Sequence, residues 1–224
     1  MKLHFESQVH FQRLVLGIIC GLLPICCILF GLIGADEALL GYRWWHSISA
    51  TYYSNSQVWM VGSLVLASFF LATYKGYDLG DRVLTLIGSV SALGIVVFPC
   101  SNPVFKRCGL FMLRTPLSHK IHCVFAAMLF ASFAVMILTQ FTKGSDMKRN
   151  MVYYICGSIM VGFMINQVIT SKLGIPGMTY VNEFFMLEAF AVAWIVKSRA
   201  ISRKSTKCVC GADTNNEEGT GTEI

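Results

Sequence analysis

The chain has 224 residues, of which 55% are hydrophobic and only 13% are charged, and its mean hydropathy is +0.61. A soluble domain uses about 25% charged residues, so this composition excludes an ordinary soluble protein. The net charge of +6 does not indicate nucleic acid, because the basic residues fall in short clusters between apolar runs, where membrane lipids are the partners they fit.

Six apolar runs are long enough to be membrane-spanning helices. In chain order they cover residues 14–35, 58–74, 83–98, 121–141, 151–169 and 180–196. A helix is expected for each run, because it satisfies every backbone N–H and C=O group within hydrocarbon. The third run is short, so we expect it to extend to Pro99 or toward Leu79. The sequence therefore predicts an all-α, polytopic transmembrane bundle of about six helices over residues 1–198.

The first run resembles a signal peptide in having Lys2 and Arg13 before it. However, residues 14–35 exceed the roughly 7 to 15 apolar residues of a signal h-region. We therefore expect this run to remain in the protein as its first membrane helix.

The distribution of basic residues predicts the orientation. Of the 18 Lys and Arg residues, twelve lie on the side of the six helices that holds both termini, and six lie on the other side. The positive-inside rule then places both termini in the cytoplasm. Residues 199–224 become polar and lack the apolar content needed to fold, so a disordered cytoplasmic tail is expected.

On the opposite side, residues 44–53, 99–120 and 171–183 are expected to converge at one end of the bundle. These segments carry several side chains that bind ligands in proteins. We predict a pocket at the outer membrane boundary, lined by His46, Ser47, Ser49, His119, His122 and Glu183. The alternative is an interfacial aromatic belt at residues 44–53, with histidines that simply face water.

Two histidines are spaced for a shared role. His119 and His122 are three positions apart, so on a helix both imidazoles project from one face and could bind a metal together with His46 or Glu183. A catalytic zinc site needs a third ligand from another segment, and the spacing does not supply it. We expect no cofactor, with zinc as the alternative.

Two cysteines, Cys100 and Cys108, lie in the predicted outer loop. Because an outer compartment is oxidising, we expect them to form a disulfide, and the alternative is two free thiols. Cys208 and Cys210 form a CxC pair in the tail, which provides too few ligands for a closed metal site.

Glu188 lies inside the last apolar run. It precedes Lys197 by nine residues, which corresponds to about 13 Å along a helix, so its carboxyl group is expected near mid-membrane. An acidic residue there favours a function in binding a proton or cation. The alternative is a protonated group that joins helices by hydrogen bonds. Candidate partners are His122, Asn166, Gln167 and serines of the second and third helices.

Several short motifs are spread over residues 40–198. They are SISATYY at 47–53, VG at 61–62, YKGYD at 74–78, ALG at 92–94 with FP at 98–99, His122 with AA at 126–127 and Phe130, and Glu188 with Trp194 and Lys197. Together they resemble a family of bacterial multi-spanning membrane proteins, a domain of unknown function. The resemblance implies the helical fold and the bacterial cytoplasmic membrane, and it implies no reaction.

The chain has a serine motif after the first predicted helix, a histidine at the start of the fourth and a glutamate in the last. The order of these three features is also distantly similar to the damage-regulated autophagy modulator family. It is similar to the membrane hydrolases that include alkaline ceramidases as well, although that group carries a His-xxx-His pair in its last helix. Residues 180–196 contain no histidine. This difference weighs against a zinc amidohydrolase.

Three functions are consistent with the sequence. The one we favour is a non-enzymatic membrane protein that binds a lipid, ion or proton through the outer His and Ser cluster and Glu188. The second is a membrane-embedded, metal-dependent lipid hydrolase, with a metal on His119 and His122, or with Ser47 or Ser49 as nucleophile. The third is a structural or assembly subunit. The sequence leaves the ligand and the oligomeric state open.

Overall fold

The computed structural model describes residues 2–33, 44–74, 76 and 78–213 of the chain. Within these residues the dominant elements are six α-helices. They are α1 (Lys2–Leu32), α3 (Gln57–Thr73), α4 (Leu79–Val97), α5 (Thr115–Val135), α6 (Met147–Leu173) and α7 (Met178–Asp213). A short hairpin of two antiparallel strands, β1 (Arg107–Cys108) and β2 (Leu113–Arg114), joins α4 to α5.

Five helices are long and apolar enough to cross a membrane. The candidate spans are Gln8–Leu32, Leu79–Val97, Thr115–Lys143, Met147–Leu173 and Met178–Ser198. The sixth helix, α3, is apolar but has only 17 residues. The structure therefore confirms a helical, multi-pass membrane protein, whereas a sixth span and the orientation of the termini stay predictions.

The helix boundaries differ from the apolar runs where polar residues continue a helix. α1 begins at Lys2, ahead of the apolar run, and α4 begins at Leu79. α7 continues to Asp213, beyond residue 198, where the tail was expected to begin. Residues 214–224 of that tail lie outside the described residues.

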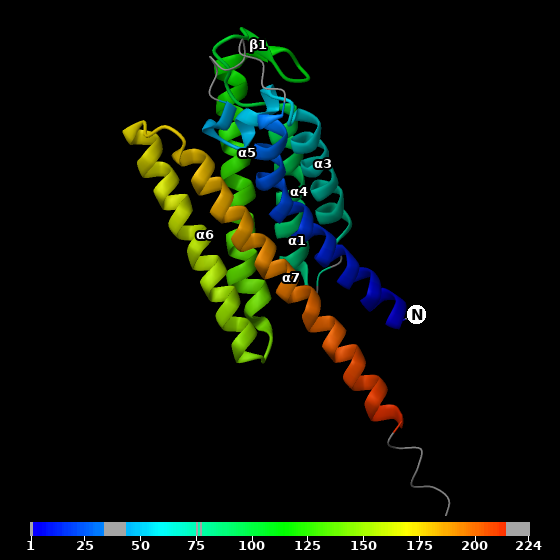
Figure 1. The fold of residues 1–224 in the computed structure, drawn as a ribbon. Coiled ribbons are helices and arrows are strands. Elements are labelled where there is room, and N and C mark those ends of the chain that lie inside the picture. Colours follow the sequence, from blue (N-terminus) through cyan, green and yellow to red (C-terminus); the bar gives the residue numbers. More distant parts are fainter. Residues whose placement is uncertain (1, 34–43, 75, 77, 214–224) are drawn as a thin grey trace, which may run out of the picture.

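The helices alternate in direction, so the connections gather at two ends (Figure 1). One end, which we call the hairpin end, holds residues 44–56, 98–114 and 174–177. The other, which we call the terminal end, holds the start of α1, the end of α7 and residues 144–146. The three segments that were expected to converge therefore do share one end.

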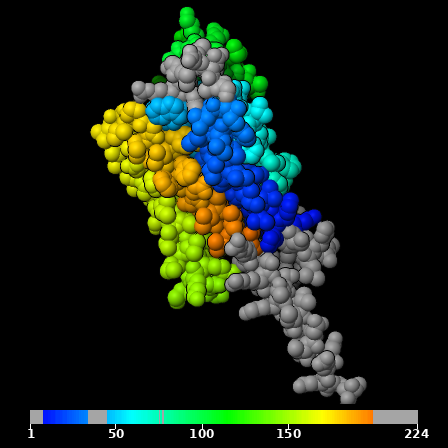
Figure 2. Space-filling view, viewed as in Figure 1, coloured from blue at the N-terminus to red at the C-terminus, as the bar shows by residue number. Residues whose placement is uncertain are grey.

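α1 and α7 lie side by side along one face of the molecule (Figure 2). Two glycines of α1 permit this close approach. A Cβ atom at Gly17 would lie 2.8 Å from Cγ1 of Ile195 and 3.1 Å from the carbonyl oxygen of Ala191. A Cβ atom at Gly21 would lie 3.3 Å from Cβ of Ala191. Larger residues at these positions would separate the two helices.

An aromatic cluster joins the helices near the terminal end. The fully buried ring of Trp194 contacts the rings of Tyr74 and Phe141, with centroid distances of 5.2 and 5.3 Å. The Arg13 side chain is also buried, and its Nε donates to the Tyr74 hydroxyl oxygen at 2.9 Å. A cation from α1 is thus held inside the bundle by a phenol oxygen and an aromatic face.

A buried amide joins α6 to α7 at the hairpin end. Asn182, which is inaccessible to solvent, accepts from Nδ2 of Asn166 at 2.7 Å. Its own Nδ2 donates to Oε1 of Gln167 at 2.8 Å and to Oγ1 of Thr170 at 3.2 Å. Interhelical hydrogen bonds of this kind stabilise helix pairs in an apolar surrounding.

At the terminal end, Asp78 caps α4 and pairs with Lys143, in the 3-10 turn Phe141–Lys143 that comes after α5. Its carboxylate accepts hydrogen bonds from Lys143 and, at 2.9 Å, from the N–H of Asp81. The bond from Lys143, and then that from Asp81, lower the pKa of Asp78 below its ordinary value of 3.8. A carboxyl whose pKa is lower in the folded state stabilises the fold well above pH 3.8, and this stabilisation is lost as the pH falls through the lowered pKa.

We therefore expect Asp78→Asn to reduce the acid sensitivity of the fold. Asn keeps the helix cap but does not titrate, so the melting temperature of the variant should fall less than that of the native protein between about pH 5 and about pH 3. Thermal unfolding in a neutral detergent measures this. Lys148→Gln, an exposed change at the same end, is the control and should keep the native pH profile. Identical profiles for native protein and Asp78→Asn would contradict the expectation.

Candidate functional site

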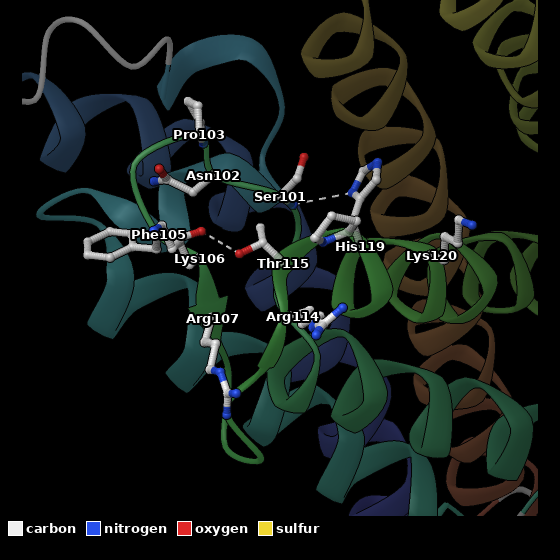
Figure 3. A pocket seen from close by; sticks show the side chains of 11 residues that line it. Ser101, Asn102, Pro103, Phe105, Lys106, Arg107, Arg114, Thr115, His119 and Lys120 are labelled. Carbon is white, nitrogen blue, oxygen red and sulfur yellow. Dashed lines mark hydrogen bonds between the residues drawn. The ribbon is translucent and has the colours of Figure 1, made fainter.

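A cavity of about 850 Å³ opens at the hairpin end, between the loop that follows α4, the two strands and the start of α5 (Figure 3). Its lining is formed by Ser101, Asn102, Pro103, Phe105, Lys106, Arg107, Arg114, Thr115, Pro116, His119 and Lys120. Because one candidate span ends at Val97 and the next begins at Thr115, the cavity lies at the boundary of the apolar part of the bundle.

Local hydrogen bonds shape the loop around the cavity. The hydroxyl of Thr115 donates to the carbonyl oxygen of Phe105 at 2.5 Å, and its N–H donates to that of Lys106 at 3.1 Å. Oδ1 of Asn102 accepts from the N–H of Val104 at 2.8 Å, which is a typical Asx turn. The chain before β1 is therefore fastened to the first residue of α5.

The tip of the hairpin is fastened to the end of α4. The N–H of Leu110 donates to the carbonyl oxygen of Val97 at 3.3 Å. Gly109 adopts a φ of +75°, and a Cβ atom there would lie 2.6 Å from that same oxygen. Only glycine combines this conformation with this approach. The hairpin therefore has a defined position beside the last turn of α4.

Two side chains of α5 donate hydrogen bonds to the backbone of the loop that follows α4. α4 ends at Val97, and its last carbonyl groups have no partner within the helix. The Ser118 hydroxyl donates to the carbonyl oxygen of Pro99 at 2.8 Å. Nδ1 of His122 donates to that of Phe98, also at 2.8 Å. Both side chains are buried, so they hold α4 and α5 together beneath the cavity.

The cavity is strongly basic. Lys106, Arg107, Arg114 and Lys120 line it, and no Asp or Glu of the described ranges does. Among the described residues, none of these four side chains has an ion-pair partner. Arg107 and Arg114 also stand directly opposite each other across the two strands. Like charges in that position destabilise a strand pair, and an anion between them would relieve the repulsion.

Neutral groups complete the basic wall. α5 begins at the cavity wall with Thr115 and Pro116, so the positive end of its helix dipole lies there. Neither residue offers a free N–H, because proline has none and that of Thr115 donates to Lys106. The Asn102 side chain is only 3% exposed, and its Nδ2 has no hydrogen-bond partner within the described part of the chain. A buried donor without an acceptor is costly, so this group provides a donor that a bound anion could use.

The structure places the six residues of the predicted His and Ser cluster in several different settings. Of its six residues only His119 lines the basic cavity, where its Nδ1 accepts from the N–H of Ser101 at 3.3 Å. His122 is buried and bonds to Phe98 beneath the cavity. His46 is exposed on the 3-10 turn Trp44–His46.

The other three predicted residues form a separate structural contact. Oε2 of Glu183, on α7, accepts from the N–H of Ile48 at 2.6 Å. Ser47 and Ser49 are buried on either side of Ile48, and the Ser47 hydroxyl accepts from the N–H of Ala50 at 3.0 Å. The contact fastens the segment before α3 to α7.

The sequence also offered candidate metal ligands, serine nucleophiles and a disulfide. Within the described ranges, no three His, Cys, Asp or Glu side chains are grouped as metal ligands. The hydroxyl of Ser47 and Nδ1 of His122 both bond to backbone groups. Cys108 is a buried free thiol, so the predicted bridge to Cys100 is absent.

Glu188 lies between α7 and α1. Its Oε2 would be 3.7 Å from a Cβ atom at Gly21, and its Oε1 is buried without a hydrogen-bond partner among the described residues. The expected partners are engaged elsewhere: Asn166 and Gln167 bond to Asn182, and His122 bonds to a backbone carbonyl. The role of Glu188 in binding a proton or cation stays a prediction.

Glu183 and Glu188 of α7 should respond differently to replacement by leucine. Glu183→Leu leaves the N–H of Ile48 without its acceptor and should lower the free energy of unfolding by about 1–3 kcal/mol. Glu188→Leu removes a carboxyl group that has no described partner, so stability should stay the same or rise by about 1 kcal/mol. Unfolding in mixed detergent micelles measures both. A larger loss for Glu188→Leu than for Glu183→Leu would show that Glu188 has a partner in the folded protein.

Sequence reasoning missed the basic cavity because its cations were counted only for orientation. A signal was present, since residues 99–120 contain four Lys and Arg residues and no Asp or Glu. Nothing comparable in the sequence indicated that Asn102 would be buried in the cavity wall. Comparison with known proteins adds no assignment: no family model, no curated protein and no solved structure matches the chain.

Proposed function

We propose that this multi-pass membrane protein binds an anionic group, such as a phosphate or carboxylate, in the basic cavity at the hairpin end. The observation that carries the proposal is a cavity wall with four cationic side chains, no carboxylate and no ion-pair partner among the described residues. Arginine and lysine at a helix N-terminus provide the charge and the hydrogen-bond donors that such a group requires.

The proposal narrows the functions that the sequence left open. Binding of a lipid or ion at the outer end is retained, with the basic residues in place of the His and Ser cluster. A lipid hydrolase is less well supported, because the described side chains include neither a metal-ligand group nor a serine–histidine pair. A purely structural subunit would not account for paired arginines around an open cavity.

We further propose that both termini face the cytoplasm, which places the hairpin end on the outer side. The support is the twofold excess of Lys and Arg on the side of the six apolar runs that holds both termini. By its family resemblance the protein would belong to the bacterial cytoplasmic membrane. In that setting the cavity would meet anions at the outer surface of the membrane.

Thermal unfolding in a neutral detergent tests the binding proposal. Titration with inorganic phosphate or glycerol 3-phosphate should raise the melting temperature in a saturable way, because a ligand that binds only the folded state stabilises it. Glycerol is the uncharged control and should have no saturable effect. A flat response to both anions, in protein that unfolds cooperatively, would contradict the proposal.

A further inference from the structure

The tip of the hairpin presents three consecutive apolar side chains to the outside. Leu110, Phe111 and Met112 are 74%, 62% and 59% exposed, whereas Cys108 and Leu113 in the strands are buried or half-buried. Apolar residues in isolation on a surface are common, but a contiguous group at a tight turn indicates a binding surface.

The position of the tip relative to the membrane follows from its contacts. The N–H of Leu110 bonds to Val97, the last residue of a candidate span, and the Phe111 ring lies 5.8 Å from the ring of Phe98. The tip is therefore held where the apolar part of α4 ends. Further down the bundle, Val90 of α4 and Val124 of α5 are also exposed, as expected of side chains that face lipid.

The two strands of the hairpin are basic, whereas its tip is apolar. Arg107 and Arg114 flank the apolar tip in its two strands, and Lys106 precedes them. An apolar tip beside clustered cations is the typical composition of an element that enters the boundary between acyl chains and anionic head groups. The apolar residues fit the chains, and the cations fit the phosphates.

We infer that the hairpin tip inserts into the outer leaflet and that the anion in the basic cavity is the phosphate of an anionic phospholipid from that leaflet. The inference rests on the proposed function and names its ligand. The cavity lies beside the tip, because Arg107 and Arg114 belong to both the hairpin and the cavity wall. A lipid whose chains contact the tip therefore has its head group within reach of the cavity.

Photo-crosslinking in liposomes tests this inference. p-Benzoylphenylalanine replaces Leu110 in one preparation and Val58, an exposed residue of α3, in the control. No Lys or Arg lies within five residues of Val58 along the chain. The liposomes contain mainly phosphatidylcholine with a minor share of phosphatidylglycerol, and mass spectrometry identifies the adducts.

At residue 110 we expect lipid adducts in which phosphatidylglycerol is enriched about fivefold over the control position. In the same background, Arg107→Gln with Arg114→Gln should keep the lipid adducts and lose the enrichment. Adducts at the bulk lipid ratio would overturn the head-group assignment. Cross-links to protein, or no lipid adduct at residue 110, would overturn the insertion of the tip. Binding of glycerol 3-phosphate is measured on the same protein in detergent. If that binding is retained while the lipid result fails, only this inference is wrong; if both fail, the proposed function is wrong as well.

Discussion

Replacement of both Arg107 and Arg114 by glutamine is expected to weaken the binding of glycerol 3-phosphate about 30-fold. Each arginine is exposed, so its contribution to binding is about 1 kcal/mol, and two contributions correspond to about 2 kcal/mol. The change should not destabilise the fold, because neither side chain has a partner among the described residues and the repulsion across the strands is removed. Calorimetric titration of the two proteins in neutral detergent measures the difference.

Lys172→Gln is the matched control for this experiment. Lys172 is exposed in the last turn of α6, at the same end of the bundle, and it does not line the cavity. Its replacement changes the net charge by one unit and should leave the affinity within about twofold of the native value. An equal loss per charge for Lys172→Gln and for the double variant would indicate a general surface potential in place of a site.

Trp194→Ala should give the largest loss of stability in the bundle, about 3–5 kcal/mol. The indole ring is fully buried and contacts the rings of Tyr74, Phe141 and Phe190, so its removal opens a cavity that several helices share. Unfolding by a denaturing detergent, followed by circular dichroism, measures the loss. Val192→Ala on the same helix is the control, because Val192 is 46% exposed. A loss for Trp194→Ala that is no greater than that of the control would show that the aromatic cluster does not hold the bundle together.

The fold was predictable where hydropathy alone decides it. Each of the six apolar runs became a helix, since a chain in hydrocarbon must satisfy its backbone groups internally. The first twelve residues of α1 were not predicted, because hydropathy detects the part of a helix within the membrane and not its continuation outside. The start of α4 at Leu79 depends on a cap by Asp78, which hydropathy does not detect.

Contacts between distant residues could not be predicted. Arg13 was counted as a charge that orients the first helix, yet it is buried against Tyr74, 61 residues later in the chain. Glu183 was expected to line a pocket, and it instead accepts from a backbone N–H of the segment before α3. In both cases the residue type suggested a polar role, but the partner depends on how the helices pack.

The candidate site was predictable in its location and not in its composition. The end of the bundle at which segments 44–53 and 99–120 meet was correct. Two-residue strands carry no recognisable β pattern, so the sequence could not show that Arg107 faces Arg114. The histidines drew attention because they commonly bind metals, whereas His122 holds the end of α4 through a carbonyl group.

Equilibrium dialysis of radiolabelled glycerol 3-phosphate against purified protein tests the central claim most directly. We predict one saturable site per chain whose affinity falls as salt is added, because the contacts are between exposed charges. Arg107→Gln with Arg114→Gln should weaken binding at this site about 30-fold, and Lys172→Gln should preserve it. An affinity in the double variant equal to that of the native protein, or no binding by the native protein at low salt, would contradict an anion site in the basic cavity.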